Sequence, residues 1–165
     1  MSINAAWKPR KGVCMSVSPA NIRRLFLEQQ PSYSASEAAD LFGMTERELH
    51  AWIEAGELEG ERANDGMRLP WAELVSFAMG FWDQEEIEAA LGDDLATTIP
   101  ELLRLAELHV RIPRIEVVAL EHVAAREGKT VSGVLGRELL DFVSVHSEWL
   151  SRDVHGFADA LAWPS

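Results

Sequence analysis

A short segment of alternating polar and apolar residues, closed by a proline, constrains this chain more than any other feature. It runs from Glu107 to Pro113 and places Leu108, Val110 and Ile112 at every second position, which is the period of a β-strand. Only helical patterns follow, so the strand has no neighbour in its own chain and its backbone groups stay unpaired. The same strand from a second copy would pair with it in a two-stranded antiparallel ribbon with two-fold symmetry. The segment therefore predicts a homodimer.

The polar face of this ribbon predicts DNA binding, because a two-stranded ribbon fits the major groove and presents one face to the base edges. That face consists of Glu107, His109 and Arg111. Two amphipathic helices are expected after it, over 115–127 and 131–150. The residues expected in the dimer core are Leu108, Val110, Ile112, Leu120, Leu135 and Leu139.

The pattern polar-Leu-polar-Val-polar-Ile-Pro, helix, Gly128-Lys129-Thr130, helix resembles the ribbon-helix-helix family of bacterial repressors and antitoxins over about 40 residues. The resemblance implies that Glu107, His109 and Arg111 read bases, although Glu107 departs from the basic or amide residue usual there. It also implies a phosphate contact at the start of the second helix, where free N–H groups and the helix dipole favour an anion. Those contacts fall at Thr130, Val131, Ser132 and Gly133. The alternative is an ordinary helical hairpin preceded by an extended linker.

Composition bounds the class of protein. The 165 residues suit one domain or two small ones, and 47% apolar with 25% charged residues is typical of a soluble globular protein. Cys14 is the single cysteine, which excludes an internal disulfide or a Cys-based zinc site and fits a reducing cytoplasm. No apolar run approaches the roughly 18 residues of a membrane span, and the N-terminus lacks a signal pattern. We therefore expect a cytoplasmic protein.

The net charge of −12 is concentrated in the middle of the chain. Residues 31–106 carry four arginines against 17 carboxylates, a net charge of −13, whereas residues 107–150 carry five cations against seven carboxylates. Residues 1–30 are basic, with a net charge of +4. DNA binding therefore has to be local, because a phosphate backbone repels an acidic surface.

The N-terminal part begins with a flexible basic tail over 1–17, in which Met15 is an alternative start, followed by a domain over 18–92. Ser34 precedes a helical pattern with Glu37 three residues later, the spacing of a capping box, and Thr45 is the expected cap of the next helix. Gly43 and Gly56 end these helices, and Asn64-Asp65-Gly66 predicts a hairpin. Over about 45 residues this run resembles the winged helix-turn-helix of the MerR and excisionase type.

The resemblance implies a secondary DNA contact through Arg47 on the second helix and through Arg62 and Arg68 on the wing. The exposed positions expected on that second helix also include three carboxylates, Glu46, Glu48 and Glu54, beside His50. Because these would repel phosphates, we expect the isolated helix-turn-helix not to bind duplex DNA. The alternative function is a protein-binding adaptor that uses the acidic helix-turn-helix as its interaction surface.

Three further segments complete the organisation. Residues 93–106 are expected to be a linker and a short helix from Pro100, after a domain boundary near residue 93. Residues 151–165 are expected to be a C-terminal tail carrying Phe157, Leu161 and Trp163. These apolar residues either fold back onto their own domain or anchor a partner's groove. The ribbon-helix-helix resemblance implies a toxin protein as that partner.

No catalytic constellation emerges, because the five histidines lack metal-ligand spacing and no phosphate-binding loop follows a strand. We therefore expect neither an enzyme nor a cofactor or metal site. The predicted fold is mainly α, with a winged helix-turn-helix-like domain followed by a ribbon-helix-helix-like dimerisation unit. The predicted function is a homodimeric DNA-binding transcriptional regulator, the antitoxin and autorepressor of a toxin–antitoxin pair.

Overall fold

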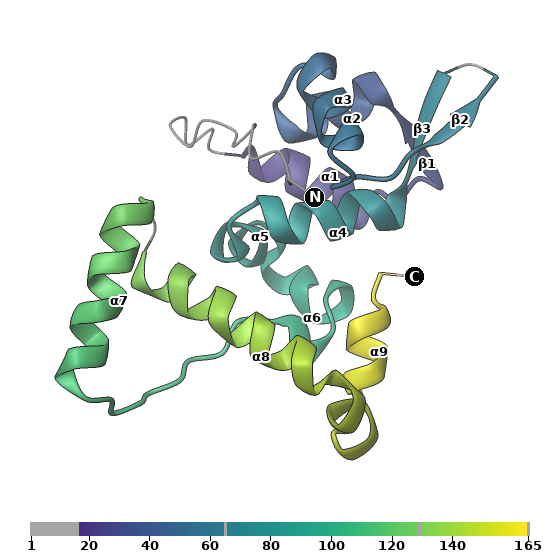
Figure 1. The fold of residues 1–165 in the computed structure, drawn as a ribbon. Helices are drawn as coiled ribbons and strands as arrows, with labels where there is room; N and C mark the ends of the chain where they lie inside the picture. The colour runs from purple at the N-terminus through teal and green to yellow at the C-terminus, as the bar shows by residue number, and fades with distance from the viewer. Residues whose placement is uncertain (1–16, 65, 129, 165) are drawn as a thin grey trace, which may run out of the picture. The chain divides into compact units, whose positions relative to one another are not determined.

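The computed structural model describes residues 17–64, 66–128 and 130–164. The chain is mainly helical and has one small antiparallel sheet (Figure 1). It divides into two compact units. Of the described residues, the N-terminal unit comprises 17–106 and 159–164, and the C-terminal unit comprises 107–158.

The N-terminal unit consists of short helices and a three-stranded sheet. In chain order its elements are α1 (Pro19–Leu27), β1 (Ser32–Ser34), α2 (Ala35–Phe42), α3 (Glu46–Glu54), β2 (Glu61–Ala63), β3 (Gly66–Pro70), α4 (Trp71–Phe81), α5 (Gln84–Leu91), η1 (Gly92–Asp94), α6 (Leu95–Thr98) and η2 (Glu101–Leu103).

Local sequence explains where α2 and α3 begin. The Glu37 N–H donates to Ser34 Oγ while the Glu37 carboxylate accepts from the Ser34 N–H at 2.8 Å. Thr45 and Glu48 repeat this reciprocal cap at the start of α3. Gly43 ends α2 with a φ of 64°, a left-handed conformation that glycine adopts without a steric penalty. The predicted capping box at Ser34 and the predicted cap at Thr45 are therefore confirmed.

The sheet has the order β1-β3-β2 and is antiparallel throughout. The hairpin of β2 and β3 pairs Ala63 with Gly66, which confirms the predicted turn, and Arg62 pairs with Met67. The strand β1, which the sequence did not indicate, pairs Tyr33 with Leu69. Its three residues extend the sheet beneath the start of α2, and Tyr33 is fully buried there.

Large apolar side chains from α1 to α5, from the sheet and from the segment after α5 form one core. The residues buried in it include Ile22, Leu25, Phe26, Leu41, Leu49, Leu69, Leu74, Ile87, Leu91 and Ile99. In α1 the positions Ile22, Leu25 and Phe26 follow the i, i+3, i+4 spacing expected of a helix with one apolar face.

The segment 93–106, expected to be a linker and a short helix from Pro100, packs on the N-terminal core and has the short helix η2 directly after Pro100. Ile99 is 1% exposed within the N-terminal core, and Leu95 and Leu103 pack against that core. The Arg23 guanidinium donates to the Ala90 carbonyl at 3.1 Å and to the Asp94 carboxylate at 2.7 Å. These contacts hold the segment on the N-terminal unit, so the division falls between residues 106 and 107 rather than near 93.

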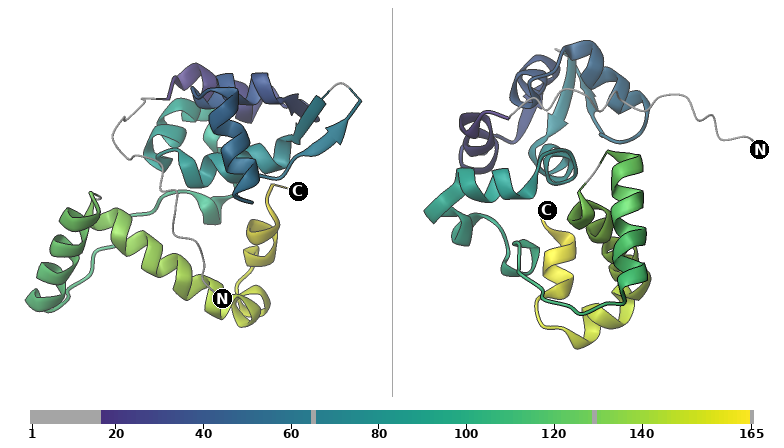
Figure 2. Two further views of the ribbon diagram at one scale, coloured as in Figure 1. Left: turned by 45° about the horizontal axis from the view of Figure 1, so that its top comes forward. Right: turned by 90° about the vertical axis from the view of Figure 1, so that its left-hand side faces the viewer.

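The C-terminal unit contains α7 (Arg114–Glu127) and α8 (Val131–Asp153). Gly128 ends α7 with a φ of 64°, and the two helices separate from this turn toward their far ends (Figures 1 and 2). Of the described apolar residues of this unit, only Ala124 and Val134 are buried. This unit thus has far less core than two helices of 14 and 23 residues can supply.

The segment after α8 also differs from the expected tail. Helix α8 continues to Asp153, and a further helix, α9 (Phe157–Ala162), follows. The Trp163 ring stacks on Phe26 of the N-terminal core, with centroids 6.4 Å apart. Of the two alternatives for the terminal aromatics, Trp163 therefore folds back, and Leu161 stays exposed.

Candidate nucleic-acid interface

The predicted base-reading residues lie on the segment before α7. Residues 107–113 form neither helix nor strand in the single chain, because a strand requires a hydrogen-bonded neighbour and the described sheet has its three strands elsewhere. The side chains of Glu107 and His109 are 93% and 92% exposed, and His109 Nε2 lies 3.6 Å from a carboxylate oxygen of Glu107. Arg111 is also exposed. All three predicted base-reading side chains are therefore accessible in the single chain.

The apolar face of the same segment is accessible as well. Leu108, Val110 and Ile112 are all exposed in the single chain. Of the other predicted core residues, Leu139 is exposed, and Leu120 and Leu135 are half-buried. Burial of an apolar side chain in a dimer would contribute about 25 cal/mol for each Å² removed from water. The predicted dimer core is therefore largely accessible in the single chain.

The residues predicted to contact a phosphate lie at the start of α8. Thr130 is the N-cap, and its Oγ1 accepts from the Gly133 N–H at 3.0 Å. The Gly133 N–H therefore has an acceptor within the chain. The N–H groups of Val131 and Ser132 stand in the first turn, where a helix supplies no acceptor of its own. No acidic residue lies in that turn, which favours an anion there.

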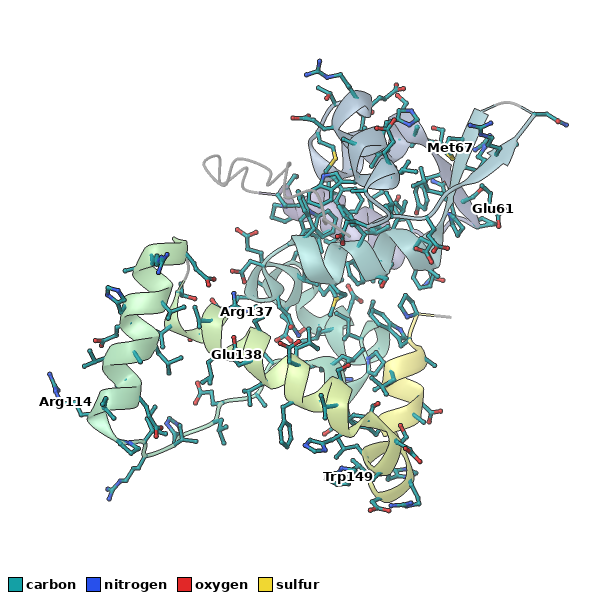
Figure 3. The ribbon with its side chains drawn as sticks, in the orientation of Figure 1. Glu61, Met67, Arg114, Arg137, Glu138 and Trp149 are labelled. Atoms are coloured by element: carbon teal, nitrogen blue, oxygen red, sulfur yellow. The ribbon has the colours of Figure 1, made fainter. Side chains whose placement is uncertain are left out.

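The cations of the C-terminal unit differ in availability. Arg137 donates to Glu127 at 2.7 Å and to Glu138 at 3.0 Å, and these carboxylates raise the pKa of its guanidinium. Arg114, at the start of α7, is exposed and extends away from the helix (Figure 3). Arg111 and Arg114 thus offer accessible charge beside the predicted ribbon, whereas Arg137 links α7 to α8. Lys129 lies outside the described residues, as do the tail cations Lys8, Arg10 and Lys11.

The predicted secondary DNA contacts separate into two groups. Arg47 on α3 and Arg62 on β2 are exposed, whereas Arg68 on β3 is half-buried and makes interactions within the chain. The positive charge of Arg68 contributes to the low pKa of Glu37, although the larger cause is the hydrogen bonding from Ser34.

The surface of α3 is acidic, as the sequence predicted. Glu46, Glu48 and Glu54 are exposed beside Arg47. Hydrogen bonds from the Thr45 backbone and hydroxyl lower the pKa of Glu48, so this carboxylate is charged at neutral pH. The surface of α3 would therefore repel a phosphate backbone.

An aromatic hollow on the N-terminal unit was not anticipated from the sequence. Trp52 of α3 meets Phe77 and Phe81 of α4 edge to face, at centroid distances of 5.4 and 6.0 Å. These rings line a hollow of about 240 Å³ together with Glu57 and Glu73. The i, i+4, i+8 spacing of Glu73, Phe77 and Phe81 was a signal for a shared helix face.

Two further properties concern metals and membranes. Within residues 17–64, 66–128 and 130–164, no group of three or more His, Cys, Asp or Glu side chains could hold a metal ion. In the part of the chain that the structure describes, every helix is too short or too polar to cross a membrane.

Comparisons of the chain with protein-family models, with curated proteins and with solved structures found no match. The resemblances to the ribbon-helix-helix and winged helix-turn-helix families therefore rest on the residue patterns of this chain.

Proposed function

We propose that the chain is a homodimeric DNA-binding transcriptional regulator, and that it acts as the antitoxin and autorepressor of a toxin–antitoxin pair. The observation that carries the proposal is the exposed segment 107–113, with its alternating polar and apolar residues, directly before a pair of helices with little core of their own. Pairing with a second copy would give the backbone of this segment hydrogen-bond partners, and it would bury the apolar faces of α7 and α8.

In this dimer, His109 and Arg111 of each copy face the major groove. Arginine is suited to a guanine, since its guanidinium can donate to O6 and N7 together. The free N–H groups at the start of α8, those of Val131 and Ser132, bind a flanking phosphate. The readers then determine the sequence preference, and the start of α8 positions the dimer on the duplex.

The experiment compares Arg111→Ala with Arg114→Ala, which removes the same charge three residues away. A duplex selected by the full chain from a random-sequence library, and a scrambled duplex, are titrated at several salt concentrations. Arg111→Ala should weaken binding to the selected duplex by about 1–3 kcal/mol, and it should weaken binding to the scrambled duplex by less. Arg114→Ala should weaken both equally, as expected for loss of a phosphate contact. An equal loss on both duplexes for Arg111→Ala contradicts the base-reading role.

The aromatic hollow favours a second function, the protein-binding adaptor. Trp52, Phe77 and Phe81 beside Glu57 and Glu73 suit a basic partner segment, because a cation is attracted to both ring faces and carboxylates. The test is a titration of the full chain with an arginine-rich peptide, followed by tryptophan fluorescence, with Phe81→Ala as the variant. Peptide binding that is lost in Phe81→Ala would support the adaptor function. If the chain binds the selected duplex but does not bind the peptide, the adaptor function is contradicted.

A further inference from the structure

From its second turn onward, α8 carries an apolar stripe that its own chain leaves accessible. Leu139, Phe142 and Trp149 are 47%, 54% and 43% exposed, and Leu135 and His146 beside them are half-buried. The five residues follow one another at intervals of four, three, four and three residues. This is the spacing by which one helix packs along another in a coiled coil.

The rings of the stripe contact one another along the helix. The Phe142 and His146 rings meet edge to face with centroids 4.4 Å apart, and His146 and Trp149 are 5.8 Å apart. Figure 3 shows Trp149 near the end of α8 remote from Glu138. The stripe is therefore a continuous surface about four turns long, which a partner helix of similar length would cover.

Charges on one edge of the stripe point to the identity of that partner. Glu138 lies beside the first part of the stripe and Arg152 beside its end, 14 residues further on. Their partners within the chain are sequence neighbours, Arg137 and Asp153, and both of these ion pairs are largely exposed. Exposed pairs of this kind contribute little to stability, so the two charges remain available to a partner.

The stripe is complementary to itself when one copy is turned end for end. Leu139 then lies level with Trp149 of the second copy, and Phe142 lies level with His146. On the shared edge, Glu138 faces Arg152 of the second copy, and the two-fold symmetry repeats this pair at the other end. A parallel arrangement would leave both charges without an oppositely charged partner.

We propose that α8 pairs antiparallel with α8 of a second copy through this stripe, and that Glu138–Arg152 ion pairs at both ends set the orientation. The proposal deepens the homodimer of the proposed function and rests on it, since it names the surface by which the copies contact one another beyond the predicted ribbon. The contact uses residues up to Arg152, well past the predicted dimer core.

Charge reversal in the full chain tests the pairing. Dimer dissociation is measured by analytical ultracentrifugation for Glu138→Arg, Arg152→Glu and the double variant. Both replacements keep strong helix formers, so α8 itself is retained. Each single variant should weaken the dimer about five- to tenfold, because two ion pairs become two like-charge contacts. The double variant should restore the original affinity. Single variants without effect, or a double variant that stays weak, would overturn the proposal.

Cross-linking provides a readout that does not depend on affinity. In a Cys14→Ser background, Val145→Cys places a thiol on the stripe's charged edge, midway between Glu138 and Arg152. Ser144→Cys, one residue away, places it on the opposite face of α8. A short bis-maleimide should link Val145→Cys chains into pairs and leave Ser144→Cys chains single. Equal linking of both, or of neither, overturns the proposal.

The two proposals fail in different ways. If the dimer responds to charge reversal as expected but shows no preference between selected and scrambled duplexes, DNA binding fails and the α8 pairing stands. If sequence preference and dimer mass persist in all charge variants and Val145→Cys chains do not link, the α8 pairing fails and the regulator stands.

Discussion

Replacing Val110 by proline should separate the two copies without unfolding either one. In the single chain, residues 105–113 lie in no helix or strand. Val110 is exposed there, so its replacement removes no packing from the fold of one copy. In the predicted ribbon the Val110 N–H donates to the opposite strand, and proline has no N–H to donate.

The two-fold symmetry doubles this loss. Each copy loses one ribbon hydrogen bond, at about 1 kcal/mol each, so the dimer loses about 2 kcal/mol, and its dissociation constant should rise about 30-fold. Analytical ultracentrifugation across a dilution series measures the dissociation constant, and circular dichroism checks that helix content is unchanged.

The neighbouring position is the control. Backbone N–H groups along a strand alternate between the partner side and the open side. Proline at His109 should therefore have the smaller effect on the dissociation constant. Equal effects at both positions, or none at either, would refute the ribbon.

Three further predictions concern caps, pH and the helix-turn-helix. Thr130→Ala should destabilise α8 by about 0.5–2 kcal/mol, seen as faster amide hydrogen exchange at Gly133, whereas Ser132→Ala should leave that exchange unchanged. Hydrogen bonding from Ser34 is the chief cause that lowers the pKa of Glu37 from 4.5 in the folded chain. The charged carboxylate therefore stabilises the fold fully above pH 4.5, and this stabilisation is lost as the pH falls through the folded-state pKa. Urea unfolding from about pH 6 to about pH 3 should show this loss, with a shallower dependence in Ser34→Ala. A fragment of residues 17–106 should fold but not shift duplex DNA at physiological salt, because its acidic surface repels phosphates; tight, sequence-specific binding would contradict this.

Short-range features of this protein were readable from the sequence. The caps at Ser34 and Thr45 join residues only three positions apart, so their geometry follows from the local chain. The same holds for the helix α5, where Asp83 accepts from the Glu85 N–H and Gly92 ends the helix. In each case, the partners are brought together by the helix turn itself.

Contacts between distant residues were decided by the tertiary structure. The sequence predicted a linker and a short helix over 93–106, yet Ile99 is buried in a core formed by residues far from it in the chain. Trp163 likewise meets Phe26 across almost the whole sequence. Periodicity shows which residues are apolar on one face, but it does not show which distant surface covers that face. In the N-terminal unit, other elements of the same fold cover these apolar faces. The apolar residues of 107–113 and α8 remain exposed in the single chain, because two helices enclose too little volume to bury them.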